Sequence, residues 1–98
     1  MARLIWSPRS SRNLQEIGDF IGQSSVRAAQ RMVKEIRARA REIPSQPYLG
    51  AIVPEYDDDL IRECQVQNFR VIYEKREDDI YVLLVWHGAR PLPKDPRR

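Results

Sequence analysis

The most constraining feature of the sequence is an apolar segment at residues 80–87, which reads IYVLLVWH. Beta-branched and aromatic residues of this kind favour a β-strand over a helix. A strand with one face in water would alternate apolar and polar side chains, whereas this strand is apolar on both faces and is therefore expected inside a sheet. It ends at His87 and is followed by Arg90. Pro91 and Pro93 then end regular pairing. The strand thus brings an imidazole and a guanidinium to one edge of the fold.

Length and composition limit the classes of protein that fit. The 98 residues are enough for one domain and too few for two, so residues 1–98 are expected to form a single domain. The net charge of +3 fits an acidic partner without identifying one. Cys64 is the only cysteine, so no internal disulfide can form, which is typical of a reducing compartment. The longest apolar run, residues 80–86, is too short for a membrane span, and the start of the chain does not resemble a signal peptide. We expect a cytoplasmic protein.

Two helices are predicted to follow a short strand at residues 3–6. Ser7 can cap the first helix, and Pro8 suits its first turn. The connection at residues 22–25 is so short that the two helices must fold back on each other as an antiparallel hairpin. Either serine of this connection can cap the second helix, which Pro44 ends. Its apolar positions recur three or four residues apart, as in a packing seam. They are Val26, Ala29, Val33, Ile36, Ala40 and Ile43.

The opposite face of the second helix is basic. Its cations lie at roughly helical spacing: Arg27, Arg31, Lys34 and Arg41. Such a face can simply keep the protein soluble. It can equally be a docking surface for an acidic partner or for phosphates. Both interpretations stay open, and Arg31 and Lys34 are the candidate contacts.

The C-terminal half predicts strands at residues 61–66 and 69–75 ahead of the central strand, with tight turns between them. In the first turn, Asn68 is expected to take the left-handed backbone conformation. The acidic sequence YDDD at residues 56–59 lacks the alternation and the glycine of a calcium loop. We therefore read it as a solvated turn and expect neither a metal ion nor another cofactor.

The predicted order is strand, two-helix hairpin and three-stranded antiparallel meander, which is an α+β fold with the helices on one face of a small curved sheet. The other face is expected to be partly open. Its edge would carry four candidate binding residues, Arg62, Arg70, His87 and Arg90. The polar, proline-rich segment 91–98 is expected to be a flexible tail.

Five motifs in this order and spacing resemble the RelE/ParE superfamily of bacterial type II toxins, across residues 3–92. They are Trp6-Ser7-Pro8, Val53-Pro54-Glu55, Ile61-Arg62-Glu63, the FRVIY sequence at residues 69–73 and the VWHGAR sequence at residues 85–90. The resemblance implies a toxin encoded beside an antitoxin, and a hetero-oligomer of the two. RelE-like members cut messenger RNA on the ribosome, whereas ParE-like members inhibit DNA gyrase. The HGAR sequence after the central strand looks more like the ParE branch.

The residues that the resemblance implies for RNA cleavage are only partly present. Cleavage by attack of the 2′-hydroxyl needs a base, an acid and a cation. Glu55, Arg70 and His87 match three positions of one nuclease type, but Gly88 stands after the histidine and no tyrosine lies beyond Tyr81. The lysine pair of other nuclease members is also missing. We therefore favour a gyrase inhibitor that is not an enzyme, with an mRNA endonuclease as the alternative.

Overall fold

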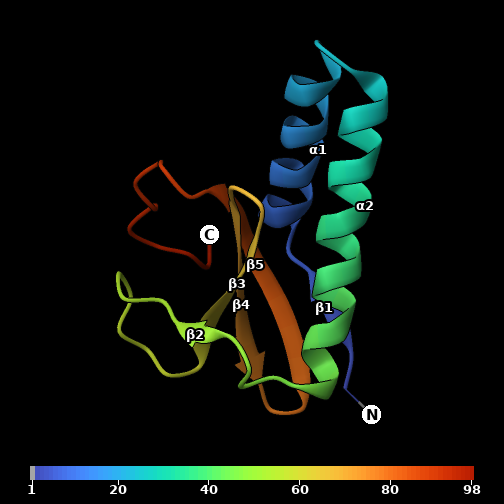
Figure 1. The fold of residues 1–98 in the computed structure, drawn as a ribbon. Helices are drawn as coiled ribbons and strands as arrows, with labels where there is room; N and C mark the ends of the chain where they lie inside the picture. The colour runs from blue at the N-terminus through green and yellow to red at the C-terminus, as the bar shows by residue number, and fades with distance from the viewer. Residues whose placement is uncertain (1) are drawn as a thin grey trace.

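The computed structural model describes residues 2–98 as two layers, a mixed sheet and a helical hairpin packed on one of its faces (Figure 1). The sheet has five strands in the order β1-β5-β4-β3-β2. In chain order the elements are β1 (Leu4–Trp6), α1 (Pro8–Gly22), α2 (Val26–Glu42), the short 3-10 turn η1 (Ile43–Ser45), β2 (Ala51–Ile52), β3 (Ile61–Val66), β4 (Phe69–Arg76) and β5 (Asp79–His87). This arrangement confirms the predicted α+β class. Within residues 2–98, neither helix has the length and apolar character that crossing a bilayer requires.

The apolar strand β5 lies inside the sheet, as predicted, between β1 and β4. It pairs in parallel with β1 and antiparallel with β4. The structure also contains β2, which the sequence analysis did not predict. This strand is only two residues long, Ala51 and Ile52, and both side chains are exposed, so it carries no hydrophobic alternation to detect. It pairs antiparallel with Glu63 and Arg62 of β3.

The helical hairpin forms as the caps predict. Ser7 Oγ accepts a hydrogen bond from the backbone N–H of Ser10 at 3.0 Å, and Ser25 Oγ accepts one from Ala28 at 3.0 Å. Each bond satisfies one backbone donor that the first turn of a helix leaves free. Along α2, Ile36 is fully buried against the sheet and α1. The first position of the predicted seam is not in the core, because Val26 begins the helix beyond the edge of the sheet and is 66% exposed.

The tight turns differ in one detail from the prediction. Gln67, and not Asn68, has the positive φ, at 54°. Glu77, the first residue of the turn between β4 and β5, has the same φ of 54°. Both two-residue turns thus require the left-handed conformation at their first position. The Asn68 carbonyl has another role, since it accepts a hydrogen bond from Gly88 N at 2.8 Å and ties this turn to the end of β5.

The sheet buries apolar side chains on both faces. The helix-covered face packs Val71, Tyr73, Val82 and Val85 against α1 and α2. The opposite face holds a second buried cluster made of Val53, Ile61, Ile72, Leu83 and Leu84. An irregularity in the pairing of β4 with β5 pairs Ile72 with Leu84 and the next residue, Tyr73, with Val82, which leaves Leu83 without a partner. Leu83 and Leu84 can therefore both join the second cluster.

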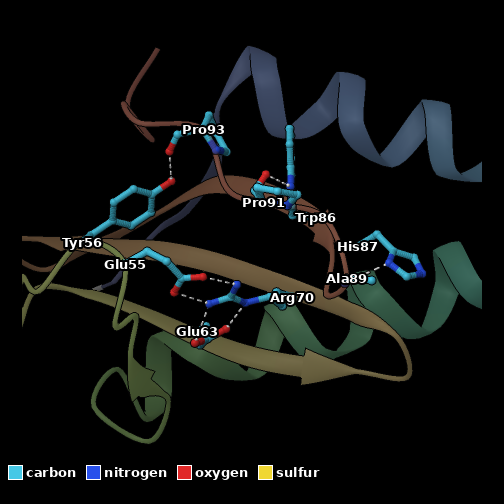
Figure 2. Close-up of polar contacts among 9 residues, drawn as sticks. All are labelled: Glu55, Tyr56, Glu63, Arg70, Trp86, His87, Ala89, Pro91 and Pro93. Atoms are coloured by element: carbon cyan, nitrogen blue, oxygen red, sulfur yellow. Dashed lines mark hydrogen bonds and ion pairs between the residues drawn. The ribbon is translucent and has the colours of Figure 1, made fainter.

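Segment 91–98, expected to be a flexible tail, lies across this second face. Leu92 packs against the second cluster, and the hydroxyl of Tyr56 donates to the carbonyl of Pro93 at 2.6 Å (Figure 2). Arg97 bonds the carboxylate of Glu74 at 2.5 and 3.0 Å. Proline removes backbone freedom, so three prolines in eight residues favour one such path. The flexibility of this segment stays a prediction, and these contacts give it a direct test.

Candidate functional site

The most concentrated polar cluster on the second face is an arginine held between two carboxylates (Figure 2). Arg70 of β4 donates to both oxygens of Glu55, with NH1–Oε2 at 2.8 Å and NH2–Oε1 at 2.9 Å. It also donates to Glu63 of β3, with Nε–Oε1 at 2.6 Å and NH2–Oε2 at 3.0 Å. The Arg70 side chain is 16% exposed, that of Glu63 is 18% exposed and that of Glu55 is 44% exposed. We call these three residues the Arg70 clamp.

The clamp changes the acid–base properties of its members. The hydrogen bonds from Arg70 lower the pKa of Glu55 to about 2, because they favour the charged carboxylate. The hydrogen bonds that Arg70 donates to Glu55 and, next in size, to Glu63 raise the pKa of Arg70 above its ordinary value. With both carboxylates ionised, the clamp carries two negative charges and one positive charge. Its net charge of −1 leaves the guanidinium no surplus for an incoming phosphate.

His87 lies at the end of β5, beside the clamp and without bonding it. Its Nδ1 accepts a hydrogen bond from the backbone N–H of Ala89 at 3.1 Å, and its ring meets Phe69 edge-on with centroids 5.5 Å apart. A neutral imidazole that accepts at Nδ1 carries its proton on Nε2, so the free nitrogen is a donor. His87 and all three clamp residues line one open groove of about 850 Å³.

The four residues expected along one edge of the sheet do not gather there. Arg62 lies on the helix-covered face, because side chains alternate along β3 and Glu63 takes the second face. Its guanidinium donates to the carbonyls of Gly50 at 3.0 Å and Asp59 at 3.0 Å and stacks on Tyr48 at 5.1 Å from the ring centroid. These contacts stabilise the connection that carries β2. Arg62 is therefore separated from the Arg70 clamp by the sheet itself.

Arg90 and the cations of α2 form two further surfaces. Arg90 stacks on Trp86, 4.5 Å from the ring centroid, and Trp86 donates through Nε1 to the carbonyl of Pro91 at 3.1 Å (Figure 2). Arg31 and Lys34 are exposed on α2. Lys34 borders a groove of about 770 Å³ between α1 and α2. The floor of this helix groove includes Val26, Ala29 and Val33, and Arg37 and Arg41 share its border with Lys34.

Comparison with known proteins identifies the family. Residues 4–92 match the family described as the ParE toxin of the type II toxin-antitoxin system parDE. The chain belongs to the ParE toxin family. It is also 28% identical, over 90 residues, to the Toxin RelE2 of Caulobacter vibrioides, an alignment that covers 92% of this chain and 99% of that protein.

Solved structures share the fold of this ParE-family toxin. A chain of the chromosomal ParDE toxin-antitoxin system from P. aeruginosa superposes with a TM-score of 0.74 at 18% identity, covering 89% of this chain and 96% of that one. A chain of the heterotetrameric YoeB-YefM toxin-antitoxin complex from Staphylococcus aureus superposes with a TM-score of 0.56 at 15% identity, covering 89% and 97%. At these identities the likeness concerns the fold, and it agrees with the predicted RelE/ParE-like arrangement.

Two site residues of this ParE-family toxin were missed or misread in the sequence. Glu63 appeared in the sequence only beside Arg62 in the Ile61-Arg62-Glu63 motif, yet the two side chains point to opposite faces. The alternation of β3 and β4 carries the missing signal, because Glu63 and Arg70 share a face and lie near each other diagonally across the strand pair. Tyr56 was read as part of a solvated loop, and nothing in its sequence context predicts the hydrogen bond to Pro93.

The geometry limits the chemistry available to this toxin. Glu55 is a weak base, Arg70 is fully engaged and His87 accepts a hydrogen bond at Nδ1. Within residues 2–98, no three carboxylate, imidazole or thiol side chains converge where they could hold a metal ion. The groove as it stands offers hydrogen-bonding groups to a partner.

Proposed function

We propose that this ParE-family toxin acts by binding and inhibiting DNA gyrase, and that a cognate antitoxin neutralises it in the cytoplasm. The observation that carries the proposal is the Arg70 clamp. The three residues matched to a nuclease are present, but Arg70 is bonded to Glu55 and also to Glu63. Family membership supports the choice of gyrase, because the resemblance implies that target for the ParE branch.

A general base must bind a proton during the reaction and works best with a pKa near the working pH. Glu55, with a pKa of about 2, holds almost no proton near neutral pH and accepts one poorly. The charge of Arg70 is more than balanced by two carboxylates, so the attraction that a phosphate needs is weak. Arg90 and the tail cations remain available for binding, although Arg97 is already paired with Glu74. Arginine stays charged at any working pH and suits binding more than proton transfer.

The antitoxin is proposed to dock on the groove between α1 and α2. This groove combines an apolar floor with three cations and one carboxylate, Asp19, and this excess of positive charge matches an amphipathic segment with an acidic face. The structures similar in fold include a toxin-antitoxin heterotetramer. By the same logic we expect a hetero-oligomer here, with Arg31 and Lys34 steering the approach of the antitoxin.

The alternative is a RelE-like, ribosome-dependent mRNA endonuclease. One observation favours it: Glu55, Arg70 and His87 line the same groove. Glu55 comes from the connection between β2 and β3 and is the most exposed member of the clamp. A ribosomal partner that drew Glu55 away would free both the carboxylate and part of the guanidinium. The alternative therefore requires this bond to break on the target.

The deciding experiment adds the purified toxin to gyrase supercoiling reactions and to ribosomes programmed with mRNA, side by side. We expect inhibition of supercoiling and intact mRNA. In growth-arrest assays, Arg90→Ala is expected to weaken toxicity strongly, whereas Glu55→Ala and His87→Ala are expected to weaken it much less. Circular dichroism must confirm that each variant folds. If the toxin cuts mRNA and the latter two variants abolish toxicity while folded, the nuclease alternative is correct.

A further inference from the structure

Five cations gather where the tail lies beside the first turns of α1. Arg9, Arg12 and Arg98 line one hollow, Arg90 lies over the same Trp86 ring as Arg9, and Lys94 stands in the chain between two lining residues, Pro93 and Asp95. We call these five cations the tail-side basic patch. Asp95 lines a hollow of about 450 Å³ together with Arg9, Arg12 and Arg98, and its Oδ2 lies 3.5 Å from Nε of Arg98. The patch therefore has more positive charge than its own carboxylate can balance.

Arg9 and Arg90 are held without a side-chain carboxylate. Arg9 donates from NH1 to the backbone carbonyl of Asp95 at 3.0 Å and to a main-chain oxygen of Arg98, the last residue of the sequence, at 3.1 Å. Arg9 and Arg90 both lie over the ring of Trp86, at 6.0 and 4.5 Å from its centroid. Carbonyls and an indole orient a guanidinium without cancelling its charge. Arg12 and Lys94 are exposed and make no hydrogen bond or ion pair within residues 2–98.

The tail-side basic patch differs in its charge balance from the other polar surfaces of the molecule. The guanidinium of the Arg70 clamp is balanced by two carboxylates. The cations of α2 border a groove with an apolar floor, which fits an amphipathic peptide. The hollow of the tail-side basic patch is lined by charged side chains and one proline, Pro93. Like charges held together without an apolar floor fit a ligand that is itself densely and uniformly charged.

We propose that the tail-side basic patch binds the phosphate backbone of duplex DNA. Planar guanidiniums bind phosphate oxygens through paired hydrogen bonds, and duplex DNA presents about one phosphate charge per 1.7 Å of its axis. An acidic protein surface would offer carboxylates at wider, irregular spacing, and its apolar part would find only Pro93 in the lining of the hollow. The inference rests on the proposed function in one respect: gyrase would be where the toxin meets DNA. The toxin would then contact both components of the gyrase–DNA complex.

The test measures binding of the purified toxin to a fluorescent duplex of about 25 base pairs, without gyrase, across a series of salt concentrations. Each phosphate contact contributes about 0.9 to the slope of log affinity against log salt. Arg12→Gln combined with Lys94→Gln should reduce the slope by about 2 and lower the affinity at least about tenfold. Both side chains make no hydrogen bond or ion pair within residues 2–98, so this double variant should fold, which circular dichroism checks.

The matched control is Arg27→Gln combined with Arg41→Gln, which removes the same net charge from α2. We expect its DNA affinity to stay within about twofold of the parent. Equal losses in both double variants would overturn the proposal, because they would reflect overall charge alone. A parent with no salt-dependent affinity for DNA would overturn it as well.

A second arm separates DNA from protein as the ligand and separates this inference from the proposed function. If Arg12→Gln with Lys94→Gln weakens binding to gyrase in the absence of DNA and leaves duplex binding intact, the patch contacts an acidic protein surface and the DNA proposal is wrong. If the parent binds DNA through the patch yet fails to inhibit supercoiling, the proposed inhibition of gyrase is wrong and the proposed DNA-binding surface is supported.

Discussion

On the helix-covered face of the sheet, β4 and β5 contribute side chains such as Val71, Tyr73 and Val82, and they pack against apolar residues of α1 and α2. The opposite face also has an apolar centre, but ion pairs surround it. Arg70 is held by Glu55 and Glu63 on one side. Apolar packing is tolerant of partner identity and sets the fold, whereas fixed charges define where a specific partner can bind. The first face therefore specifies the architecture, and the second presents the candidate sites.

The clearest case of this contrast is Glu74, a carboxylate that is only 6% exposed. Burial alone would raise its pKa, but hydrogen bonds from Arg97 and Arg76 outweigh burial, and its pKa is lowered. Arg97 reaches Glu74 from the tail, which makes this ion pair the main polar attachment of segment 91–98. The helical hairpin is attached by apolar area, and the tail is attached by charge and by Leu92. The two attachments should respond differently to substitution.

The largest effect is expected from Ile36→Ala on the helix-covered face. Ile36 is fully buried at the contact between α2, α1 and the sheet. Removing its side chain loses apolar burial and leaves a cavity, which typically lowers the free energy of unfolding by about 2–4 kcal/mol. Urea denaturation measures the change. The matched control is Val26→Ala, at an exposed position of the same helix, which should cost well under about 1 kcal/mol. Equal midpoints for all three proteins would rule out the proposed packing.

A smaller effect is expected from Arg97→Ala on the second face. Glu74 would lose one of its two arginine partners while keeping Arg76. We expect the free energy of unfolding to fall by about 1–2 kcal/mol, as for loss of a hydrogen bond to a charged group. Arg98→Ala, on the same segment but with a side chain 86% exposed, is the control and should have almost no effect. If Arg97→Ala also leaves the free energy of unfolding unchanged, the tail is flexible in solution, as the sequence suggested.

The sequence predicted the elements whose signals are local and repeated. A few neighbouring residues are enough to predict each of these features. They are the seam of α2, the caps at Ser7 and Ser25 and the two-sided apolar pattern of β5. Two features had no such local signal. The strand β2 has only two residues, Ala51 and Ile52, and it forms by pairing with the edge strand β3. The path of the tail depends on partners about 23 to 89 positions away in the chain.

Only part of the candidate site could be predicted, because some of its contacts depend on residues that are distant in the chain. Motif positions identified Glu55, Arg70 and His87, and the structure places all three along one groove. The motifs could not indicate that Glu63 shares Arg70, because that contact depends on the register of β3 against β4. Arg62 was also expected at the edge of the open face, whereas it lies on the helix-covered face. Consecutive residues of a strand alternate between faces, so an error of one position moves a side chain across the sheet.

The Arg70 clamp predicts a weak pH dependence of stability. The pKa of Glu55 is lowered from 4.5 to about 2 in the folded protein. Its contribution is therefore present above about pH 4.5 and is lost as the pH falls towards 2. Because Glu55 is partly exposed, this contribution should stay below about 1 kcal/mol. Glu55→Gln should thus be less stable than the parent at pH 7 and should approach it near pH 2, as measured by thermal unfolding. A difference that stays constant over this range would mean that the clamp does not form.

The smallest effect on stability, and a clear effect on binding, is expected from Arg31→Glu combined with Lys34→Glu. Both side chains are exposed on α2 and form no ion pair within residues 2–98, so the free energy of unfolding should change by less than about 0.5 kcal/mol. Association with an acidic antitoxin should nevertheless slow, because long-range attraction steers charged partners together and two cations become anions. Stopped-flow association at several salt concentrations measures this, and the double variant should show a weaker salt dependence than the parent. The control is Arg12→Glu combined with Lys94→Glu, which makes the same charge change away from the helix groove. If both variants slow association equally, net charge governs the encounter and α2 is not the docking surface; if neither does, the basic face of α2 is only a solvated surface.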